Sequence, residues 1–525
     1  MTASHAPSTS LRFTLANTPP NWRPSIVSAI FACALYAVTI CGSYVYDDVA
    51  RVHDDPRYAS PAQWGKLWTE AYALDSIDNL YRPLTSTTYA IEWWLHGDRS
   101  WAFHLVNILL NALAAGLVAE FARRLTNSRV AYLAGLLFAV HPIHVEAAAN
   151  IVGRAELLCT IGTIGALVLF LRRPVTFGRA LAITLCYLLA LLSKEQGILL
   201  PLLLLIVSWL RKRGEKGTRP PGERPALLLL AVMCVWISAG YLLYREHILP
   251  MAWDRNQLDW TINPMIRSQG IHRWLMPLVL LGHYAQLMAV PLKLSPDYGA
   301  LVLGAVVDRH DPYLYFGLLI AVTWVVTLIL AIRRHWDVVT FCLLGLGLTY
   351  GMVSNFGIII GTNLAERLMY LPSAFALILV SLLLARIRGR VLLPIFAIIL
   401  ALASARTATY AWRWNDRLRL YSSSLAENPK SIRLHMLKAY ELMEQRHYAE
   451  SEEILAEARQ MLPEYYSLWM QSALLAERQQ HWDQASHYLD EAIKRMINPT
   501  VAILQKENLS QLREASTKPA TTESH

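Results

Sequence analysis

Val45-Tyr46-Asp47-Asp48 follows directly on the first long apolar segment of the chain, residues 25–42. Two adjacent carboxylates cannot stay in lipid, because one Asp at the centre of a membrane helix costs about 2.5–3.5 kcal/mol. Asp47 and Asp48 must therefore lie at the water boundary or line a polar cavity, where paired carboxylates are candidates for general-base or metal-binding chemistry. The alternative is that the pair only ends the helix at the interface.

The composition is that of a membrane protein. Hydrophobic residues make up 54% of the 525 residues and charged residues 17%, and the mean hydropathy is +0.31. Several stretches reach the roughly 20 apolar residues that a spanning helix needs, so we expect an all-α, polytopic membrane bundle. The net charge of +9 comes from short basic clusters at helix ends. Because these clusters form no basic face interleaved with aromatic residues, we expect no nucleic-acid partner.

The basic clusters predict the topology, since cytoplasmic loops of membrane proteins are rich in Lys and Arg. Placing every cluster in the cytoplasm predicts about eleven spans, at residues 25–42, 102–122, 130–141, 155–171, 179–193, 196–210, 226–244, 313–332, 338–356, 366–385 and 390–406. The apolar stretch 272–291 is left over, and we expect it to lie along the outer face or to re-enter from it.

This topology divides the chain into expected parts. Residues 1–24 form a cytoplasmic tail without the pattern of a cleavable signal, and the first span is an uncleaved anchor. Residues 25–406 form the membrane domain, which includes a large outer loop at 43–100. The chain then leaves the membrane on the outer side.

The last hundred residues contain an internal repeat. Arg446-His447-Tyr448 recurs 34 residues later as Gln480-His481-Trp482, and Pro429 and Pro463 have the same offset. Two amphipathic helices in a unit of this length, with a Pro near the unit end, are typical of tetratricopeptide repeats. We predict a repeat domain over 407–510, with two units at about 430–463 and 464–498, and a disordered tail at 511–525.

The unusual polar residues converge on the expected outer side. Besides Asp47 and Asp48, the outer loops and hairpin tips contain Arg82, His141, His144, Glu146, Arg154, Glu156, Lys194, Glu195, Asp297, Glu366, Arg367 and Tyr370. The cytoplasmic connections are plain basic turns, so we place the working face outside.

Each of these groups has an alternative interpretation. His141, His144 and Glu146 could hold a metal ion, but Pro142 disrupts a regular helical pair of ligands, which favours hydrogen-bonded structural histidines. Lys194–Glu195, Arg154–Glu156 and Glu366–Arg367 are either ion pairs that lock the bundle or sources of cations for a lipid phosphate.

A face of this kind suits a sugar carried on a lipid phosphate. Lys194 and Arg367, with Arg82 or Arg154, would hold the phosphate as the leaving group. Asp47 or Asp48 would deprotonate an acceptor hydroxyl that attacks the anomeric carbon, and a single displacement inverts that centre. The chain has no Gly-x-x-x-x-Gly-Lys-Ser/Thr sequence, which argues against an ATP-driven transporter.

The motifs resemble those of the transmembrane-and-tetratricopeptide-repeat protein O-mannosyltransferases, which belong to the C-type glycosyltransferase superfamily. The resemblance covers nearly the whole chain, and the matching stretches are Tyr46-Asp47-Asp48, Tyr81–Thr85, His104–Asn107, His141–Glu146, Val152–Glu156, Leu192–Gly197, Leu294–Asp297 and Ala365–Pro372. It implies a multispanning enzyme that uses a polyprenyl- or dolichyl-phosphate sugar. Some members of the superfamily need a divalent cation such as Mg²⁺ or Mn²⁺ and others do not, so the resemblance leaves the metal requirement open.

The resemblance also implies roles for the acidic pair and the repeats. Asp47 would be the base by similarity to the Asp-Glu pair of the protein O-mannosyltransferases, and because Asp48 replaces the Glu here, the choice between the two stays open. About two repeat units, instead of the long arrays of eukaryotic members, suggest a bacterial relative in an inner membrane with its repeats in the periplasm.

We therefore expect an inverting glycosyltransferase that acts on a protein or envelope-glycan hydroxyl, with a protein acceptor held by the repeats. A transporter or flippase for a lipid-linked substrate is one alternative, although unbroken, charge-free span interiors argue against it. A membrane-anchored repeat scaffold for envelope assembly is the other, although a scaffold would not need the outward polar residues.

Overall fold

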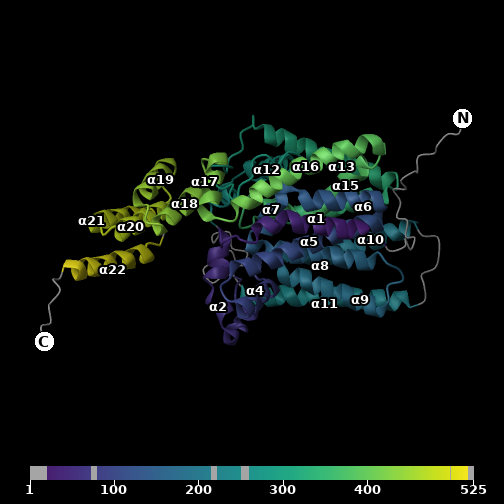
Figure 1. Cartoon of the computed structure of the whole chain (residues 1–525), viewed down its shortest axis with the longest axis horizontal. Coiled ribbons are helices and arrows are strands. Elements are labelled where there is room, and N and C mark those ends of the chain that lie inside the picture. Colours follow the sequence, from purple (N-terminus) through teal and green to yellow (C-terminus); the bar gives the residue numbers. More distant parts are fainter. Residues whose placement is uncertain (1–20, 73–79, 215–221, 250–258, 497, 518–525) are drawn as a thin grey trace. The chain divides into compact units, whose positions relative to one another are not determined.

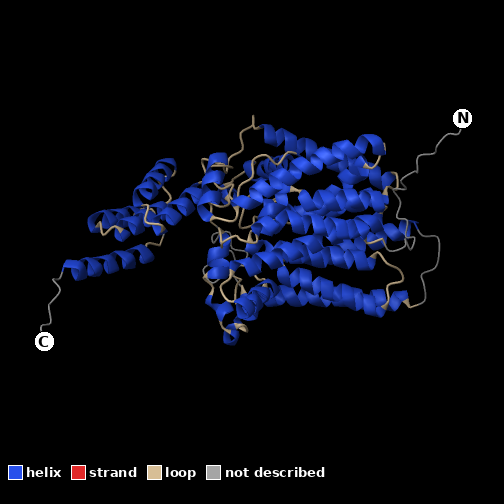
Figure 2. Ribbon diagram, in the orientation of Figure 1, coloured by secondary structure: helices blue, strands red, loops and turns tan. Residues whose placement is uncertain are grey.

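The computed structural model of the chain describes residues 21–72, 80–214, 222–249, 259–496 and 498–517. The described residues form helices joined by loops and contain no β-strand (Figure 2), which confirms the predicted all-α class. They divide into two compact bodies. We call Met1–Pro296 with Gly304–Asp416 the bundle body, and Asp297–Leu303 with Arg417–His525 the repeat body.

Long helices lie side by side in the bundle body (Figure 1). They are α1 (Arg23–Tyr36), α5 (Ser100–Leu125), α6 (Ser128–Val140), α8 (Arg154–Phe170), α9 (Phe177–Ser193), α10 (Leu200–Gly214), α11 (Glu223–Ile248), α12 (His272–Ala289), α13 (Pro312–Arg333), α14 (Asp337–Gly351), α15 (Tyr370–Leu384) and α16 (Gly389–Arg413). A helix therefore occupies most of each range predicted to span the membrane.

Not all of these helices are long enough to span a membrane by themselves. Among the described residues, six are long and apolar enough: α5, Ile151–Phe170, α11, α13, Glu366–Leu384 and α16. The bent pair Ser128–Val140 and Pro142–Ala149, which turns by 54°, would be a seventh, whereas Arg23–Thr39, α9 and α14 are apolar but shorter. The count of eleven spans and the orientation in the membrane stay predictions.

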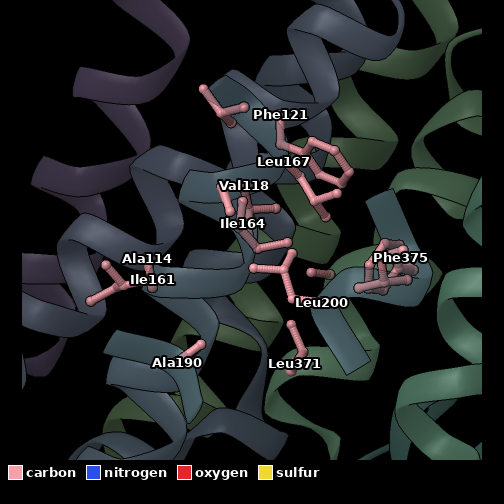
Figure 3. Close-up of a cluster of buried hydrophobic side chains, with 14 of the residues drawn as sticks. Ala114, Val118, Phe121, Ile161, Ile164, Leu167, Ala190, Leu200, Leu371 and Phe375 are labelled. Atoms are coloured by element: carbon pink, nitrogen blue, oxygen red, sulfur yellow. The ribbon is translucent and has the colours of Figure 1, made fainter. Parts of the chain in front are cut away.

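Interlocking apolar side chains hold the middle of the bundle together. Figure 3 shows this cluster, whose labelled residues come from five helices: Ala114, Val118 and Phe121 of α5, Ile161, Ile164 and Leu167 of α8, Ala190 of α9, Leu200 of α10, and Leu371 and Phe375 of α15. The Phe121 ring meets the Phe375 ring edge-on at 6.0 Å. Because lipid tails are as apolar as these side chains, close packing rather than water exclusion drives such contacts. The packing fixes the ends of these helices, which carry the polar residues.

Two glycines allow α12 to pack tightly along α13. A Cβ added to Gly317 would lie 1.8 Å from the carbonyl oxygen of Leu278, and one added to Gly282 would lie 2.2 Å from that of Tyr313. Small residues at a contact let two helix backbones approach closely, as is common in membrane bundles. The stretch 272–291 is thus a helix fixed to α13, while its placement along or into the membrane stays a prediction.

Short helices lie between the long ones. They are η2 (Val49–His53), α2 (Pro56–Ala59), η3 (Pro61–Gln63), α3 (Lys66–Thr69), α4 (Pro83–His96), η4 (Pro142–His144), α7 (Val145–Ala149), η5 (Ile151–Gly153), η6 (Glu195–Leu199), η8 (Pro264–Arg267) and η9 (Glu366–Met369), with η1 (Ala37–Thr39) extending α1. Figure 1 shows α2 and α4 at one end of the bundle. Tyr81, just before α4, packs its ring near those of Tyr241 and Tyr244 in α11.

The helices of the repeat body recur with the 34-residue period predicted from the sequence. Its helices are α17 (Arg417–Glu427), α18 (Ile432–Glu444), α19 (Tyr448–Met461), α20 (Tyr466–Arg478), α21 (Trp482–Ile493) and α22 (Thr500–Thr517). α18 and α20 begin 34 residues apart, as do α19 and α21. The left-handed residues Arg446 and Gln480 end the first helix of each pair at equivalent positions. This geometry supports the tetratricopeptide interpretation.

The predicted boundary of the disordered tail was wrong for residues 511–517. α22 continues to Thr517, because Ala502 and Leu509 are buried and the helix packs against α21. Residues 518–525, the rest of that predicted tail, lie outside the described residues.

We predict that Gly317→Ala destabilises the bundle by about 1–3 kcal/mol, the usual cost of overpacking a close contact. The added methyl group must push α12 and α13 apart. Thermal unfolding of the purified protein in detergent would measure the loss. The matched control is Gly240→Ala in α11, where a Cβ meets nothing within 4 Å; equal unfolding midpoints for the two variants would contradict the prediction.

Candidate active site

The two adjacent aspartates have different surroundings. Asp48 is fully buried, and its carboxylate accepts the backbone N–H of Val152 at 2.8 Å. The side chain of Asp47 keeps 9% of its surface exposed, and its Oδ2 lies 3.7 Å from a guanidinium nitrogen of Arg367. Asp47 thus faces a cation and Asp48 faces the backbone.

Asp48 ties the end of the first apolar segment to the start of α8. Backbone N–H groups of Val152, Ile151 and Val45 donate to its carboxylate, and Val152 and Ile151 belong to η5, the turn that leads into α8. Burial raises the pKa of Asp48 to about 7, although these donors act in the opposite direction. The residue therefore positions the first turn of α8, which carries Glu156.

Arg367 is held by a carboxylate that is distant in the sequence. Glu146 of α7 is fully buried; it accepts the backbone N–H of Arg367 at 2.9 Å and also pairs with its guanidinium group. The Arg367 side chain keeps 21% of its surface exposed. One guanidinium group is thus shared between Glu146, which anchors it, and Asp47, which it faces at a longer distance.

Two further ion pairs come from the starts of α4, α8 and η6. Lys194 pairs with Glu156, and both are buried. Arg82 pairs with Glu195 at 3.0 Å, and its guanidinium carbon lies 5.4 Å from the centre of the Tyr72 ring. The hydroxyl of Thr85 donates to the carbonyl oxygen of Ser193, which holds the start of α4 against the end of α9.

Electrostatic interactions join these pairs into one group. Burial lowers the pKa of Lys194, Glu156 raises it and Arg82 lowers it further. Burial also lowers the pKa of Arg82, but Glu195 and, more weakly, Glu156 raise it above its ordinary value. Glu156 also interacts with Arg367. We call the seven residues Asp47, Arg82, Glu146, Glu156, Lys194, Glu195 and Arg367 the ionic cluster.

Arg154 belongs to a separate, fully buried network. It pairs with Glu92, donates from Nε to Asn107 at 2.8 Å and lies 4.7 Å from the centre of the Tyr89 ring. No surface of its side chain is exposed. This arrangement makes Arg154 a structural residue that holds α8 to α4 and α5, and not a cation for a phosphate.

One of the two alternatives that the sequence left open, ion pairs between near neighbours in the sequence, does not agree with the structure. Lys194 pairs with Glu156 and not Glu195, Arg154 with Glu92 and not Glu156, and Arg367 with Glu146. Glu366 instead accepts the backbone N–H of Ser295 at 2.7 Å. The physical reason is that side chains one or two positions apart on a helical turn point in different directions.

The histidines are hydrogen-bonded to other groups. The two ring nitrogens of His141 contact the carbonyl oxygen of Met288 and the N–H of Ile143, and those of His144 contact Phe138 and Ser373. With Glu146 bound to Arg367, the three residues do not converge on one point. In the described part of the chain, no group of three or more His, Cys, Asp or Glu residues is arranged to hold a metal ion.

Two other predicted site residues lie outside the ionic cluster. The hydroxyl of Tyr370 donates to Asn111 at 2.6 Å inside the bundle. Asp297 belongs to the repeat body, where its Oδ2 accepts the hydroxyl of Ser431 at 2.6 Å.

Several residues that position the site are not marked by any motif in the sequence. Tyr72, Asn111 and Ser373 carry no motif of their own. A polar residue in an otherwise apolar helix, such as Asn111, is the one signal that could have found some of them.

Comparison with known proteins gives a family match over part of the chain. The model of the family described as "Dolichyl-phosphate-mannose-protein mannosyltransferase" matches residues 83–243. A protein O-mannosyl-transferase of Caenorhabditis elegans is 24% identical over 422 residues, which are 76% of this chain and 57% of that protein. Protein O-mannosyl-transferase TMTC3 of Mus musculus is 23% identical over 84% of this chain and 51% of its own length. The chain thus spans about half the length of these curated relatives.

A shorter alignment with another relative has a higher sequence identity. Protein O-mannosyl-transferase TMTC1 of Homo sapiens is 35% identical over 170 residues, which are 30% of this chain and 18% of that protein. Among solved structures, ArnT from Cupriavidus metallidurans bound to undecaprenyl phosphate has 15% identity and a TM-score of 0.44, covering 90% of this chain and 80% of that one. The apo state of the same protein has 17% identity and a TM-score of 0.45, covering 89% and 79%.

We predict that Asp48 makes the protein less stable as the pH rises from about 4 to about 7. Its pKa is raised in the folded state, so in this range the folded chain keeps a proton that the unfolded chain has released. Each pH unit in that window then costs on the order of 1.4 kcal/mol. Asp48→Asn keeps an oxygen that can accept the N–H of Val152 but does not titrate.

The thermal-unfolding midpoint, measured across this pH range, should therefore vary less for Asp48→Asn than for the unmodified chain. Asp54→Asn is the control, because the Asp54 side chain is 61% exposed. The same pH slope for all three proteins would contradict the assignment of a raised pKa to Asp48.

Proposed function

We propose that this chain, a relative of the protein O-mannosyltransferases, is a membrane glycosyltransferase that transfers a sugar from a polyprenyl-phosphate donor to a protein or envelope-glycan hydroxyl outside the membrane. The ionic cluster is the observation that carries the proposal, because it combines an accessible carboxylate, Asp47, with the cations Arg367, Lys194 and Arg82. The names of the family model and of the relatives support a phosphate-linked mannose donor.

The geometry favours Asp47 over Asp48 as the general base. A base must reach the proton that it removes. The carboxylate of Asp48 is enclosed and engaged by backbone N–H groups. Asp47 keeps part of its surface exposed, and the nearby Arg367 stabilises its ionised form. Asp48 then acts as a positioning residue for α8.

The cations of the cluster are suited to hold a phosphate. Arg367, Lys194 and Arg82 are each oriented by a glutamate, namely Glu146, Glu156 and Glu195. With all seven residues ionised, four carboxylates face three cations, so a phosphate must compete with carboxylates for the same donors. The glutamates therefore orient the cations before the lipid binds and limit the affinity for the phosphate.

The reaction follows from these positions. Asp47 takes the proton of the acceptor hydroxyl, whose oxygen forms a bond to the anomeric carbon of the sugar. The bond from that carbon to the phosphate oxygen breaks, and the polyprenyl phosphate leaves with its negative charge held by Arg367 and Lys194. One displacement of this kind inverts the anomeric centre, and every step uses residues of this chain.

The proposal also includes the acceptor of the sugar and the membrane in which the protein lies. The repeat body has the helix-pair geometry of modules that bind polypeptides in a groove, which supports a protein acceptor. An inner membrane with the repeats in the periplasm agrees with the basic clusters at the helix ends. A lipid-linked substrate transporter or a repeat scaffold would bind or move the lipid without transferring its sugar.

We predict that Asp47→Asn lowers transfer by roughly 10²–10⁴-fold, the usual contribution of a general base. The assay uses full-length protein in liposomes with polyprenyl-phosphate mannose and an envelope extract as acceptor, and it measures mannose that becomes bound to protein or glycan. Asp48→Asn should lose less activity, and Asp54→Asn should keep it. Full transfer by Asp47→Asn would refute the assignment of the base.

We also predict that Lys194→Met weakens the binding of undecaprenyl phosphate by about tenfold or more, because a charge-assisted hydrogen bond to the phosphate is lost. Titration with the lipid phosphate and with uncharged undecaprenol, followed by intrinsic fluorescence, separates the headgroup from the chain. Lys293→Met is the control, because Lys293 is exposed and outside the cluster. Unchanged affinity in Lys194→Met would exclude Lys194 from the phosphate site.

A further inference from the structure

Three arginines gather at the end of the bundle body opposite to the ionic cluster. Arg124 lies in the last turn of α5, Arg172 follows the end of α8, and Arg179 lies in the first turn of α9. Arg172 is close enough to the other two guanidinium groups to interact with both electrostatically. We call Arg124, Arg172 and Arg179 the arginine triad. α9 (Phe177–Ser193) ends directly before Lys194, so about 24 Å of helix separates the triad from the ionic cluster.

The carboxylates near the triad do not balance its charge. Glu120 is shared by two guanidinium groups, since Arg123 and Arg124 each pair with it at 2.7 Å. Nε of Arg124 is buried without a hydrogen-bond partner among the described residues. Arg172 is exposed, and its side chain forms no hydrogen bond or ion pair in the described part of the chain. Arg179 donates to backbone carbonyl oxygens of the turn after α8. The triad therefore has unused capacity to bind an anion.

Other arginines at this end of the bundle have structural partners. Nη2 of Arg211 and Nη2 of Arg213 donate to carbonyl oxygens in the last turns of α8 and α13, at 2.6 and 2.8 Å. Such carbonyl groups lack backbone donors, and a cation beside them is favourable. Arg173 pairs with Glu223 at 2.7 Å. The preference for basic residues in cytoplasmic loops accounts for arginines at this end, but not for three of them placed near one another, because like charges repel.

An exposed apolar stripe begins beside the triad. Phe177, Leu181 and Leu185 follow one another at intervals of four residues and so lie on one face of α9. Their exposed fractions are 55%, 60% and 58%, whereas other residues of α9 pack against α8 and α11 (Figure 1). We call these three residues the α9 stripe. Cations next to an apolar stripe match a molecule that has both a negative head group and an apolar chain, and not a small soluble anion.

We propose that the arginine triad binds the phosphate of an anionic phospholipid whose acyl chain lies along the α9 stripe. The site lies at the end of the bundle that the sequence predicts to be cytoplasmic, and it does not depend on the proposed sugar transfer. A guanidinium group can donate two parallel hydrogen bonds to phosphate oxygens. Basic pockets between membrane helices on the cytoplasmic side bind the head groups of anionic lipids in this way. A bound phosphate replaces the repulsion within the triad by attraction and so holds α5, α8 and α9 together.

Native mass spectrometry of the full-length protein tests the site, with equal amounts of phosphatidylglycerol and phosphatidylcholine that carry the same acyl chains. Arg172→Gln should weaken the binding of phosphatidylglycerol by about threefold to tenfold, because a charge-assisted donor is lost, and leave that of phosphatidylcholine unchanged. Arg172→Lys keeps the charge and should keep most of the affinity. The matched control is Arg333→Gln, which removes an exposed arginine from the end of α13. Equal binding by Arg172→Gln and Arg333→Gln, or equal binding of the two lipids by the unmodified chain, would overturn the proposal.

Thermal unfolding in detergent distinguishes a lipid from a free anion. Phosphatidylglycerol should raise the unfolding midpoint of the unmodified chain more than that of Arg172→Gln, because a ligand stabilises the state that binds it. Inorganic phosphate should raise neither, and equal stabilisation by inorganic phosphate would overturn the lipid site. Without lipid, Arg172→Gln should unfold at the same midpoint as the unmodified chain or at a higher one. A lower midpoint would assign Arg172 a structural role and overturn the proposal, whatever the outcome for sugar transfer.

Discussion

Buried ion pairs between distant parts of the chain hold the polar end of the bundle in place. Removing a charge from water costs several kcal/mol, and losing one partner of a buried pair costs about 3–5 kcal/mol. Arg367 with Glu146 and Arg154 with Glu92 bring together segments that are 221 and 62 residues apart. Each pair is satisfied only when its helices occupy their native positions. The charges that would serve the chemistry are therefore also the charges that align the ends of these helices.

The exposed fraction of its side chain distinguishes a cation that only stabilises the structure from one that can also bind a ligand. Arg154 has no exposed side-chain surface, and its donors are directed to Glu92, Asn107, Thr88 and the Phe103 carbonyl oxygen. Lys194, Arg82 and Arg367 keep 5%, 13% and 21% of their side-chain surface exposed. A lipid phosphate can reach only cations of the second kind. The first kind provides the rigid frame that a preorganised site requires.

The sequence predicts where the helices lie better than it predicts which residues of different helices contact one another. Apolar runs locate the long helices, and the 34-residue period locates the paired helices after residue 430, because both signals are local. The polar residues predicted to converge on the outer side include all seven members of the ionic cluster. The sequence does not show that Lys194 meets Glu156, or that Gly317 meets Leu278. Those contacts depend on how separate helices pack, and adjacent acids and bases suggest pairs that helix geometry does not allow.

Asp47 and Asp48 show how one local backbone feature can give two identical side chains different roles. Tyr46, just before them, has a φ of 55°, a left-handed conformation that costs an aromatic residue of order 1–3 kcal/mol and persists only where surrounding contacts enforce it. The hydrogen bond from Tyr46 to Pro296 and the edge-on contact of its ring with Trp414 are such contacts. The turn directs one carboxylate toward the N–H groups before α8 and the other toward Arg367. The strain is stored one residue before the proposed base, where a change in either contact would alter the direction of its carboxylate.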